Sequence, residues 1–322
     1  MRAEQIAQME NLANTPPVFV VGPVRSGSTL LKLMLDSHPQ VINPGECDFL
    51  FDLVGNHGEF PDTRAYLDWL STNRIFQAKK LTVDPNLTYL ELMNSFLCQF
   101  KRRGSLLTMN VHRHFDRIPG VFPDARYVRL LRDPRDVARS CISMGWVGHV
   151  YYGVDIWSEA EKSWDLLRSR ISATQYLEIR YEDLVSDVEA GLRKICDFLG
   201  LEHSNQMTAY ASHSTYSAPD KDLIYQWKRK YTERELRLVE GKVGTRIVDL
   251  GYELSVHEPA KPGLLEKIRL YLLNKRRRVS HQVKRYGMFL YFESLLASRM
   301  GSRAWRHACQ HKKNKIDIEY LK

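Results

Sequence analysis

A strand, a glycine-bracketed loop and a helix follow one another directly near the start of the chain. Residues 17–24 are rich in β-branched and aromatic side chains and are closed by Gly22 and Pro23, which predicts a buried strand. Residues 29–37 carry apolar side chains at 30, 31, 33, 34 and 35, which predicts a helix buried on most of its faces. A strand that passes into a helix in this way favours a sheet covered by helices.

Strands and helices continue to alternate through most of the chain. Further strands are predicted at 105–111, 126–131 and 176–180. Helical patterns fall at 46–55, 63–77, 86–102, 134–144, 187–199 and 233–243. This order predicts an α/β fold with a P-loop-like parallel sheet flanked by helices.

Positive charge is concentrated at the C-terminal end. The whole chain has a formal net charge of +9, but residues 261–322 hold 16 Lys and Arg against 4 Asp and Glu, a net of +12. The other 260 residues hold the remaining 31 basic and 34 acidic side chains, a net of −3. We therefore expect an N-terminal segment at 1–15, a globular domain at 16–258 and a basic helical extension at 259–322.

The basic extension has two predicted helical stretches, 264–285 and 286–300, interrupted by the four consecutive cations at 275–278. Leucine, phenylalanine and tyrosine side chains lie between its charges. This mixture is typical of an amphipathic helix that sits on an anionic membrane or an acidic polymer. A pair of helices docked on the domain, with a solvated charged face, is the alternative.

Several other classes of protein are disfavoured. The five cysteines are widely spaced and include no CxxC pair, so neither a disulfide framework nor a zinc site is expected. Residues 1–15 are polar and no window holds the roughly 20 apolar residues of a membrane span. We therefore expect a cytoplasmic protein, and the basic extension adds the expectation of a peripheral position on the inner face of a membrane.

The glycine-bracketed loop has the spacing of a phosphate-binding loop. Gly22 and Gly27 enclose four residues and are followed by Ser28 and Thr29. Such a loop aims backbone N–H groups and the positive end of a helix dipole at one point, which favours a bound phosphate. A Walker A loop would have lysine where this chain has Ser28, and its cation is Arg25 instead.

Several blocks of the chain resemble the sulfotransferase family that uses 3′-phosphoadenosine 5′-phosphosulfate (PAPS), and most closely its tyrosylprotein and bacterial branch. They are, in chain order, 23–31 with 35–39, 127–140, 179–184 and 251–253. Together they extend over residues 16–254. The resemblance implies the sulfotransferase fold, PAPS as sulfuryl donor, and in-line displacement without a metal.

The resemblance assigns the loop to the 5′ end of the donor. Arg25 aligns with the cation that stabilises charge on the leaving 5′-phosphate. The residues expected to supply backbone and hydroxyl donors to the same group are Ser26, Gly27, Ser28 and Thr29.

Further residues are assigned to the 3′ end and to the base. Arg132 and Ser140, eight residues apart on a strand end and the next helix, are expected to bind the 3′-phosphate. The alternative for Arg132 is a surface ion pair with a neighbouring aspartate. Tyr181 is expected to face the adenine, with a core tyrosine as the alternative. Lys228 and Arg229 resemble a late loop that folds over the nucleotide and reaches the 3′-phosphate.

Two residues compete for the role of general base. Glu46 matches the position of a glutamate in the tyrosylprotein branch, whereas His112 falls where cytosolic members have histidine after a strand. Histidine works unaided near neutral pH. We favour Glu46 because the surrounding motifs follow the glutamate branch; the alternative for His112 is a loop histidine with satisfied hydrogen bonds.

One position departs from the family. Members usually carry a lysine on the strand before His112, where this chain has Asn110 or Val111. Arg113 is the candidate to replace that lysine.

The acceptor is predicted less directly. Aromatic residues are frequent in 46–102 and 145–170, which with the basic extension favours a hydroxyl on a saccharide or glycolipid. The hydroxyl of a tyrosine or of another phenol is the alternative acceptor. A P-loop kinase of a small metabolite is the rival enzyme, but it would need lysine at position 28 and a magnesium-binding aspartate. A nucleic-acid-binding module would leave the first 255 residues unexplained, so no nucleic-acid partner is expected.

Overall fold

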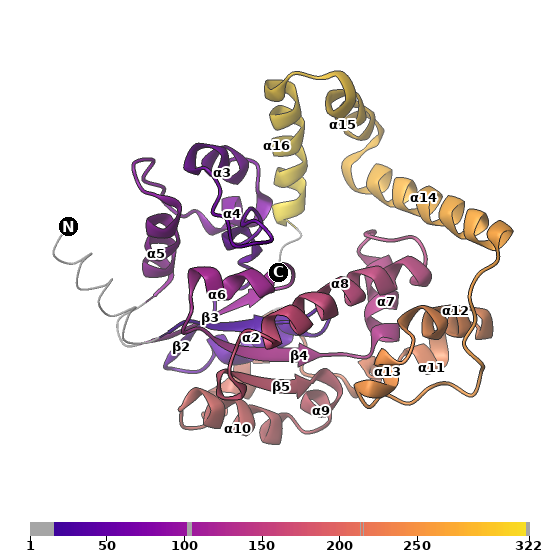
Figure 1. The fold of residues 1–322 in the computed structure, drawn as a ribbon, viewed down its shortest axis with the longest axis horizontal. Coiled ribbons are helices and arrows are strands. Elements are labelled where there is room, and N and C mark those ends of the chain that lie inside the picture. The colour runs from indigo at the N-terminus through magenta and orange to yellow at the C-terminus, as the bar shows by residue number, and fades with distance from the viewer. Residues whose placement is uncertain (1–15, 102–104, 213, 215, 320–322) are drawn as a thin grey trace. The chain divides into compact units, whose positions relative to one another are not determined.

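The structure, a computed structural model, describes residues 16–101, 105–212, 214 and 216–319, and Figure 1 traces the chain as a ribbon. The predicted N-terminal segment 1–15 lies outside the described residues. The chain divides into two compact units. The first unit comprises Met1–Leu131 and Ala160–Lys221, and the second comprises Arg132–Glu159 and Asp222–Lys322. The predicted division at residue 258 stays a prediction.

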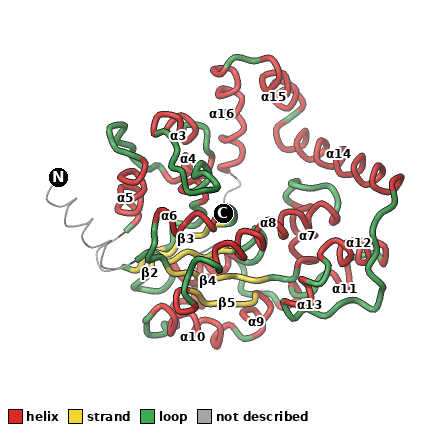
Figure 2. Tube along the Cα trace, in the orientation of Figure 1, coloured by secondary structure: helices red, strands yellow, loops and turns green. Residues whose placement is uncertain are grey.

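The first unit is built on a parallel sheet of five strands, drawn in yellow in Figure 2. The strands are β1 (Val18–Val21), β2 (Val41–Ile42), β3 (Leu106–Val111), β4 (Arg126–Leu131) and β5 (Tyr176–Arg180). Their order is β2-β3-β1-β4-β5, and each neighbouring pair is parallel. The four strands predicted from the sequence are confirmed, whereas β2 has only two residues and gives no periodic pattern.

Strand β1 lies at the point where the order of strand addition reverses. The chain leaves β1 for β2 and β3 on one side and then crosses to β4 and β5 on the other. In open parallel sheets, ligands bind outside the carboxyl ends of the strands at such a switch point. The glycine loop at 22–27 begins at the carboxyl end of β1.

The described residues of the first unit also form seven helices (Figure 1). They are α2 (Ser28–Asp36), α3 (Thr63–Leu70), α4 (Arg74–Lys79), α5 (Tyr89–Phe100), α6 (Ile118–Val121), α9 (Tyr181–Ser186) and α10 (Val188–Leu199). The parallel sheet flanked by helices confirms the predicted fold class. The helix predicted at 46–55 is wrong: only one 3-10 turn forms, at Asp48–Leu50. Glu46 instead pairs with Asn110 of β3 in a parallel bridge, which holds the backbone extended.

The second unit is helical. Its helices are α7 (Pro134–Ser143), α11 (Trp227–Lys230), α12 (Glu233–Val243), α13 (Arg246–Asp249), α14 (Leu264–Tyr286), α15 (Met288–Met300) and α16 (Arg303–Glu319). Helix α8 (Val150–Arg168) contributes its first part to the second unit and its last part to the first.

The basic extension is more regular than its sequence predicted. Helix α14 continues through the cations at 275–278, where an interruption was expected, and ends before Gly287, whose φ is 78°. Exposed arginine and lysine are good helix formers, so a run of them does not break a helix. Helix α16 was not predicted. Among the described residues, no helix combines the length and the apolar content that a bilayer span requires.

Candidate active site

Two glycines shape the loop between β1 and α2. Gly22 has a φ of 148°, and a Cβ atom there would lie 2.4 Å from the carbonyl oxygen of Leu130. Gly27 has a φ of 91° and caps α2, and its Cβ atom would lie 2.3 Å from the Tyr181 ring. Both positions therefore require glycine, because a side chain would meet backbone or a buried ring.

The loop has features of an anion site. Arg25 adopts a φ of 70°, a left-handed conformation that costs energy for a residue with a side chain and often marks functional sites. Ser26 is 1% exposed, and its Oγ has no hydrogen-bond partner among the described residues. The nine-residue helix α2 that follows has no acidic residue in its first turn. A buried hydroxyl without a partner among the described residues, beside a helix N-terminus that has no side-chain cap, fits a ligand that bears oxygen atoms and negative charge.

His112 ties the two ends of the loop together. Its Nδ1 lies 3.1 Å from the carbonyl oxygen of Gly22, and its Nε2 lies 3.3 Å from Ser28 Oγ. Since a carbonyl only accepts, Nδ1 carries the proton in this arrangement and the Ser28 hydroxyl donates to Nε2. The ring is 7% exposed, so the structure places His112 as a brace of the loop.

Asn110, one of the two candidates for the position of the expected lysine, also supports the loop. Its Nδ2 donates to the carbonyl oxygen of Ser28 at 3.1 Å, and its Oδ1 accepts from Asn43 at 3.3 Å. The neutral amide therefore stabilises the start of α2 without adding a positive charge.

Glu46 lies beside the same strand end. The peptide groups on either side of it bond to Asn110: Cys47 N donates to the Asn110 carbonyl at 2.8 Å, and Asn110 N donates to the Gly45 carbonyl at 3.0 Å. These bonds fix the backbone of Glu46 next to the residue that contacts Ser28. The Glu46 side chain is half-buried, and among the described residues no hydrogen bond or ion pair is found for its carboxylate.

The residues predicted for the 3′-phosphate belong to the second unit. Arg132 is 8% exposed; its Nη2 donates to the Leu223 carbonyl at 2.9 Å, and its own carbonyl accepts from Trp157 Nε1 at 3.3 Å. Ser140 is half-buried on α7. Lys228 and Arg229 are exposed on the short helix α11. This helix begins four residues after Leu223, whose carbonyl accepts from Arg132.

Comparison with known proteins identifies the family. The profile described as "Sulfotransferase family" matches residues 16–206. The chain belongs to the sulfotransferase family. The omega-hydroxy-beta-dihydromenaquinone-9 sulfotransferase Stf3 of Mycobacterium tuberculosis is 25% identical over 316 residues, covering 78% of this chain and 79% of that protein. A putative protein-tyrosine sulfotransferase of Caenorhabditis briggsae is 22% identical over 270 residues, covering 75% of this chain and 91% of that protein.

Solved structures agree on the fold. The sulfotransferase domain from the Synechococcus PCC 7002 olefin synthase has a TM-score of 0.57 at 22% identity, covering 74% of this chain and 95% of that domain. The sulfotransferase domain from the curacin biosynthetic pathway has a TM-score of 0.54 at 20% identity, covering 75% of this chain and all of that domain. The chain is thus a transferase with the sulfotransferase fold.

Tyr181 of this sulfotransferase lies against the glycine loop at 22–27. It is the first residue of α9 and is 4% exposed, and its ring fills the space that a side chain at Gly27 would occupy. The core contact that was the alternative for Tyr181 is therefore present. Its contact with adenine stays a prediction.

Arg113 is engaged by an acidic partner. Its Nε and Nη2 lie 2.6 and 2.7 Å from the two carboxylate oxygens of Asp52. Burial alone would lower the pKa of Arg113, but Asp48, Asp52 and Glu46 together raise it. The side chain is charged and held by two bonds to Asp52, so it is a poor replacement for the missing lysine.

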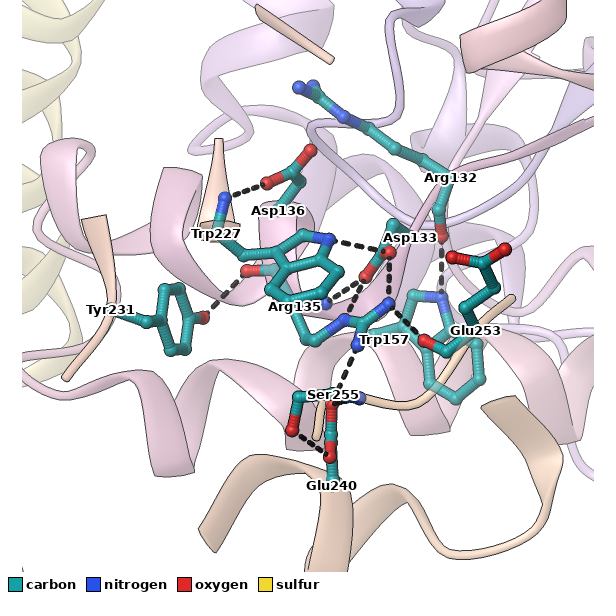
Figure 3. A network of polar contacts seen from close by, with 10 residues as sticks. All are labelled: Arg132, Asp133, Arg135, Asp136, Trp157, Trp227, Tyr231, Glu240, Glu253 and Ser255. Atoms are coloured by element: carbon teal, nitrogen blue, oxygen red, sulfur yellow. Dashed lines mark hydrogen bonds and ion pairs between the residues drawn. The ribbon is translucent and has the colours of Figure 1, made fainter. Parts of the chain in front are cut away.

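Sequence reasoning missed a buried ionic network in the second unit of this sulfotransferase (Figure 3). Arg135 is 1% exposed and bonds to both Asp133 and Glu240, with the Arg135 Nη1–Glu240 Oε1 distance 2.6 Å. The ring of Trp227 covers the guanidinium at 3.5 Å, and its Nε1 donates to Asp133 at 3.0 Å. Figure 3 shows the Arg132 side chain directed away from this network. The network therefore fixes the backbone next to Arg132 and leaves its guanidinium outside.

Asp136 lies at the edge of this network. Its Oδ1 accepts from Trp227 N at 2.9 Å. Burial raises its pKa from 3.8 to about 6, although Arg132 opposes that shift. The sequence shows the charges at 132–136, but no local pattern connects them to Trp227 and Glu240, which lie about a hundred residues away in the chain.

Proposed function

We propose that this sulfotransferase transfers the sulfuryl group of PAPS to an acceptor hydroxyl. The observation that carries the proposal is the buried Ser26 hydroxyl without a partner among the described residues, next to the N-terminus of α2. The 5′-phosphosulfate would bind to Arg25 and to the N–H and hydroxyl groups of 26–29. These groups provide positive charge and donors where negative charge builds up on the leaving oxygen.

For the 3′-phosphate we assign Arg132 and Ser140, assisted by Lys228 and Arg229. A guanidinium can donate two parallel bonds to a phosphate. Burial of the Arg132 side chain and the fixed backbone beside it support a specific role rather than a solvated surface charge. Tyr181, which already contacts the loop, is assigned to the adenine.

For the general base we favour Glu46 over His112. Both ring nitrogens of His112 are engaged, one by the Gly22 carbonyl and one by Ser28. In the proposed step, the acceptor oxygen attacks sulfur while a Glu46 oxygen takes its proton. The bond from sulfur to the phosphate oxygen breaks in line, and adenosine 3′,5′-bisphosphate leaves.

The sequence favours a hydroxyl on a saccharide or glycolipid, and of these we propose a hydroxyl carried by a lipid. The Stf3 relative is named as a sulfotransferase of a hydroxylated menaquinone, which is a lipid. A tyrosine acceptor is the second candidate, because the Caenorhabditis briggsae relative is named as a putative protein-tyrosine sulfotransferase.

A thermal-shift experiment tests the donor. Adenosine 3′,5′-bisphosphate without metal is expected to raise the melting temperature, and ATP with magnesium is expected to have little effect. Stabilisation by ATP with magnesium alone would contradict the proposal and favour a kinase. The effect arises because a ligand that binds only the folded state stabilises it in proportion to its affinity.

A further inference from the structure

Large apolar side chains are exposed along two helices of the second unit. Phe289 is 93% exposed, Leu265 82% and Met300 79%. The full set on α14 and α15 is Leu264, Leu265, Ile268, Tyr271, Leu272, Met288, Phe289, Phe292, Leu295, Leu296 and Met300. We call these side chains the apolar surface. Soluble proteins rarely expose so many large apolar groups together unless a partner covers them.

The face of α14 opposite its exposed apolar side chains packs against other residues of the second unit. Asn274 Oδ1 accepts from Gly148 N at 2.6 Å, and Arg277 Nη1 donates to the Gly148 carbonyl at 3.0 Å. Asn274, Arg277 and His281 follow Leu270, which is 6% exposed, at intervals of four, three and four residues, so they share one helix face. The apolar residues of α14 lie on the other side.

Glycines let this face approach closely. A Cβ atom at Gly148 would lie 2.5 Å from the Asn274 carbonyl, and one at Gly145 would lie 2.0 Å from the His281 ring. Helix α14 is therefore held by specific contacts and keeps its apolar face outward. The docked-helix alternative therefore holds for this face of α14, whereas binding of the outward face to a membrane stays a prediction.

Helix α15 presents a similar stripe. Phe289, Phe292, Leu296 and Met300 follow one another at intervals of three, four and four residues, which places them on one face. Tyr291, on another face, is 7% exposed. The exposed stripe is thus a regular feature of a helix whose other side is packed.

Basic side chains accompany the apolar surface. The exposed cations on α14 include Lys267, Arg269, Lys275, Arg276 and Arg278. The acidic residues between 264 and 300 are Glu266 and Glu293. Glu266 bonds to Arg234 at 2.8 Å, and Glu293 accepts from Lys312 at 3.0 Å. The free charge of the surface is therefore positive.

The sign of this charge identifies the partner. If a second copy covered the apolar surface with its own, the two sets of cations would repel each other. An anionic bilayer provides negative headgroups for the cations and an acyl boundary for leucine and phenylalanine side chains. Lysine and arginine can extend their charged ends toward the headgroups while their stems lie along the apolar face.

We propose that α14 and α15 bind the surface of a bilayer that contains anionic phospholipid, with the apolar surface inserted at the headgroup boundary. This interaction is independent of the proposed sulfuryl transfer.

Vesicle sedimentation of the full chain tests the proposal, with phosphatidylcholine vesicles that contain or lack phosphatidylserine. Binding is expected only with phosphatidylserine and should weaken as salt rises. The variant Phe289→Ser/Phe292→Ser should lose binding. Val256→Ser is the matched control, because Val256 is 96% exposed in the same unit but outside the apolar surface. All substituted side chains are exposed, so these variants should fold.

Charge variants give a second comparison. Arg276→Gln/Arg278→Gln should weaken binding to phosphatidylserine vesicles about fivefold per charge, or roughly 25-fold together. Lys194→Gln, an exposed cation of α10, is the control and should bind like the original chain.

Three results would overturn the proposal. The first is that the original chain does not bind phosphatidylserine vesicles. The second is that the Phe289→Ser/Phe292→Ser variant binds them as well as its control does. The third is that the original chain forms a dimer, which this variant abolishes, and does not bind vesicles. None of these results would change the binding of adenosine 3′,5′-bisphosphate, which the thermal-shift experiment measures without vesicles or acceptor.

Discussion

At the scale of single residues, His112 and Glu46 are distinguished by what they touch. His112 is fixed at both ring nitrogens, whereas the Glu46 carboxylate has no hydrogen bond or ion pair within the described chain. A base must reach an incoming hydroxyl, and a brace must hold the backbone in place. The two roles predict different behaviour on substitution.

For His112, the side-chain amide of asparagine can replace the Nδ1 donor to Gly22, whereas alanine cannot. We expect His112→Ala to destabilise the fold by about 1–3 kcal/mol through the unpaired Gly22 carbonyl, and to raise KM for PAPS. His112→Asn should recover most of both losses. Denaturation and kinetics across pH distinguish the alternatives: equal loss of kcat in both variants, with a changed acid limb of the pH profile, would identify His112 as the base.

For Glu46, the expected defect is in the chemical step. Glu46→Gln should lower kcat by about 10²–10⁴-fold, because a positioned general base contributes that much. Affinity for adenosine 3′,5′-bisphosphate, measured by calorimetry, should not change. Glu159→Gln, at an exposed position of α8, is the control. A Glu46→Gln variant that keeps full kcat would exclude Glu46 as the base.

Asp136 gives a pH-dependent prediction. Burial raises its pKa from 3.8 to about 6, so the folded state holds this proton more tightly than the unfolded state. That stabilisation is complete below about pH 4 and is lost as pH rises to about 6. Asp136→Asn should therefore raise the free energy of unfolding at neutral pH, with a difference that disappears in acid. Denaturant titrations over this pH range measure the free energy of unfolding of both proteins, and Asp197→Asn, at an exposed position, is the control. A lower stability of Asp136→Asn than of the original chain at neutral pH would contradict the account.

At the scale of elements, the loop between β1 and α2 depends on its packing against α9. Gly27 and Gly58 have similar φ angles, 91° and 89°, but only Gly27 faces a ring, since nothing lies within 4 Å of a Cβ atom at Gly58. Substitution by alanine at these two positions therefore separates backbone strain from steric overlap.

We expect Gly58→Ala to cost about 1–2 kcal/mol of unfolding free energy for the left-handed conformation. Gly27→Ala should cost a further amount of about 1–3 kcal/mol because the Tyr181 ring must move. Only Gly27→Ala should also weaken bisphosphate binding. Chemical denaturation and calorimetry of both variants check this; equal effects would show that the ring contact is unimportant.

Elements with strong local patterns could be predicted from the sequence. The apolar runs of β1, β3, β4 and β5 and the glycine spacing of the loop are local, so fold class and family were accessible. The extended backbone at Glu46 could not be predicted from the sequence, because its bridge partner Asn110 lies 64 residues away. The position of the His112 ring could not be predicted either, because its partner Gly22 lies 90 residues away. Contacts of this kind depend on tertiary structure, which no local period encodes.

At the scale of the whole molecule, charge and chemistry are distributed differently. Residues 1–260 are slightly acidic and contain the glycine loop proposed to bind the donor and both candidate bases, whereas residues 261–322 carry a net charge of +12. The extension is thus expected to affect where the protein acts, and the loop to determine which reaction it performs.

The transfer reaction itself tests the central claim most directly. The protein is incubated with PAPS labelled in its sulfuryl group and separately with lipid, glycolipid, peptide and phenol acceptors. We predict label on a lipid-borne hydroxyl, one adenosine 3′,5′-bisphosphate released per group transferred, and near-complete loss of transfer in Glu46→Gln. Transfer to none of these acceptors, by a protein that instead moves phosphate from ATP, would contradict the account.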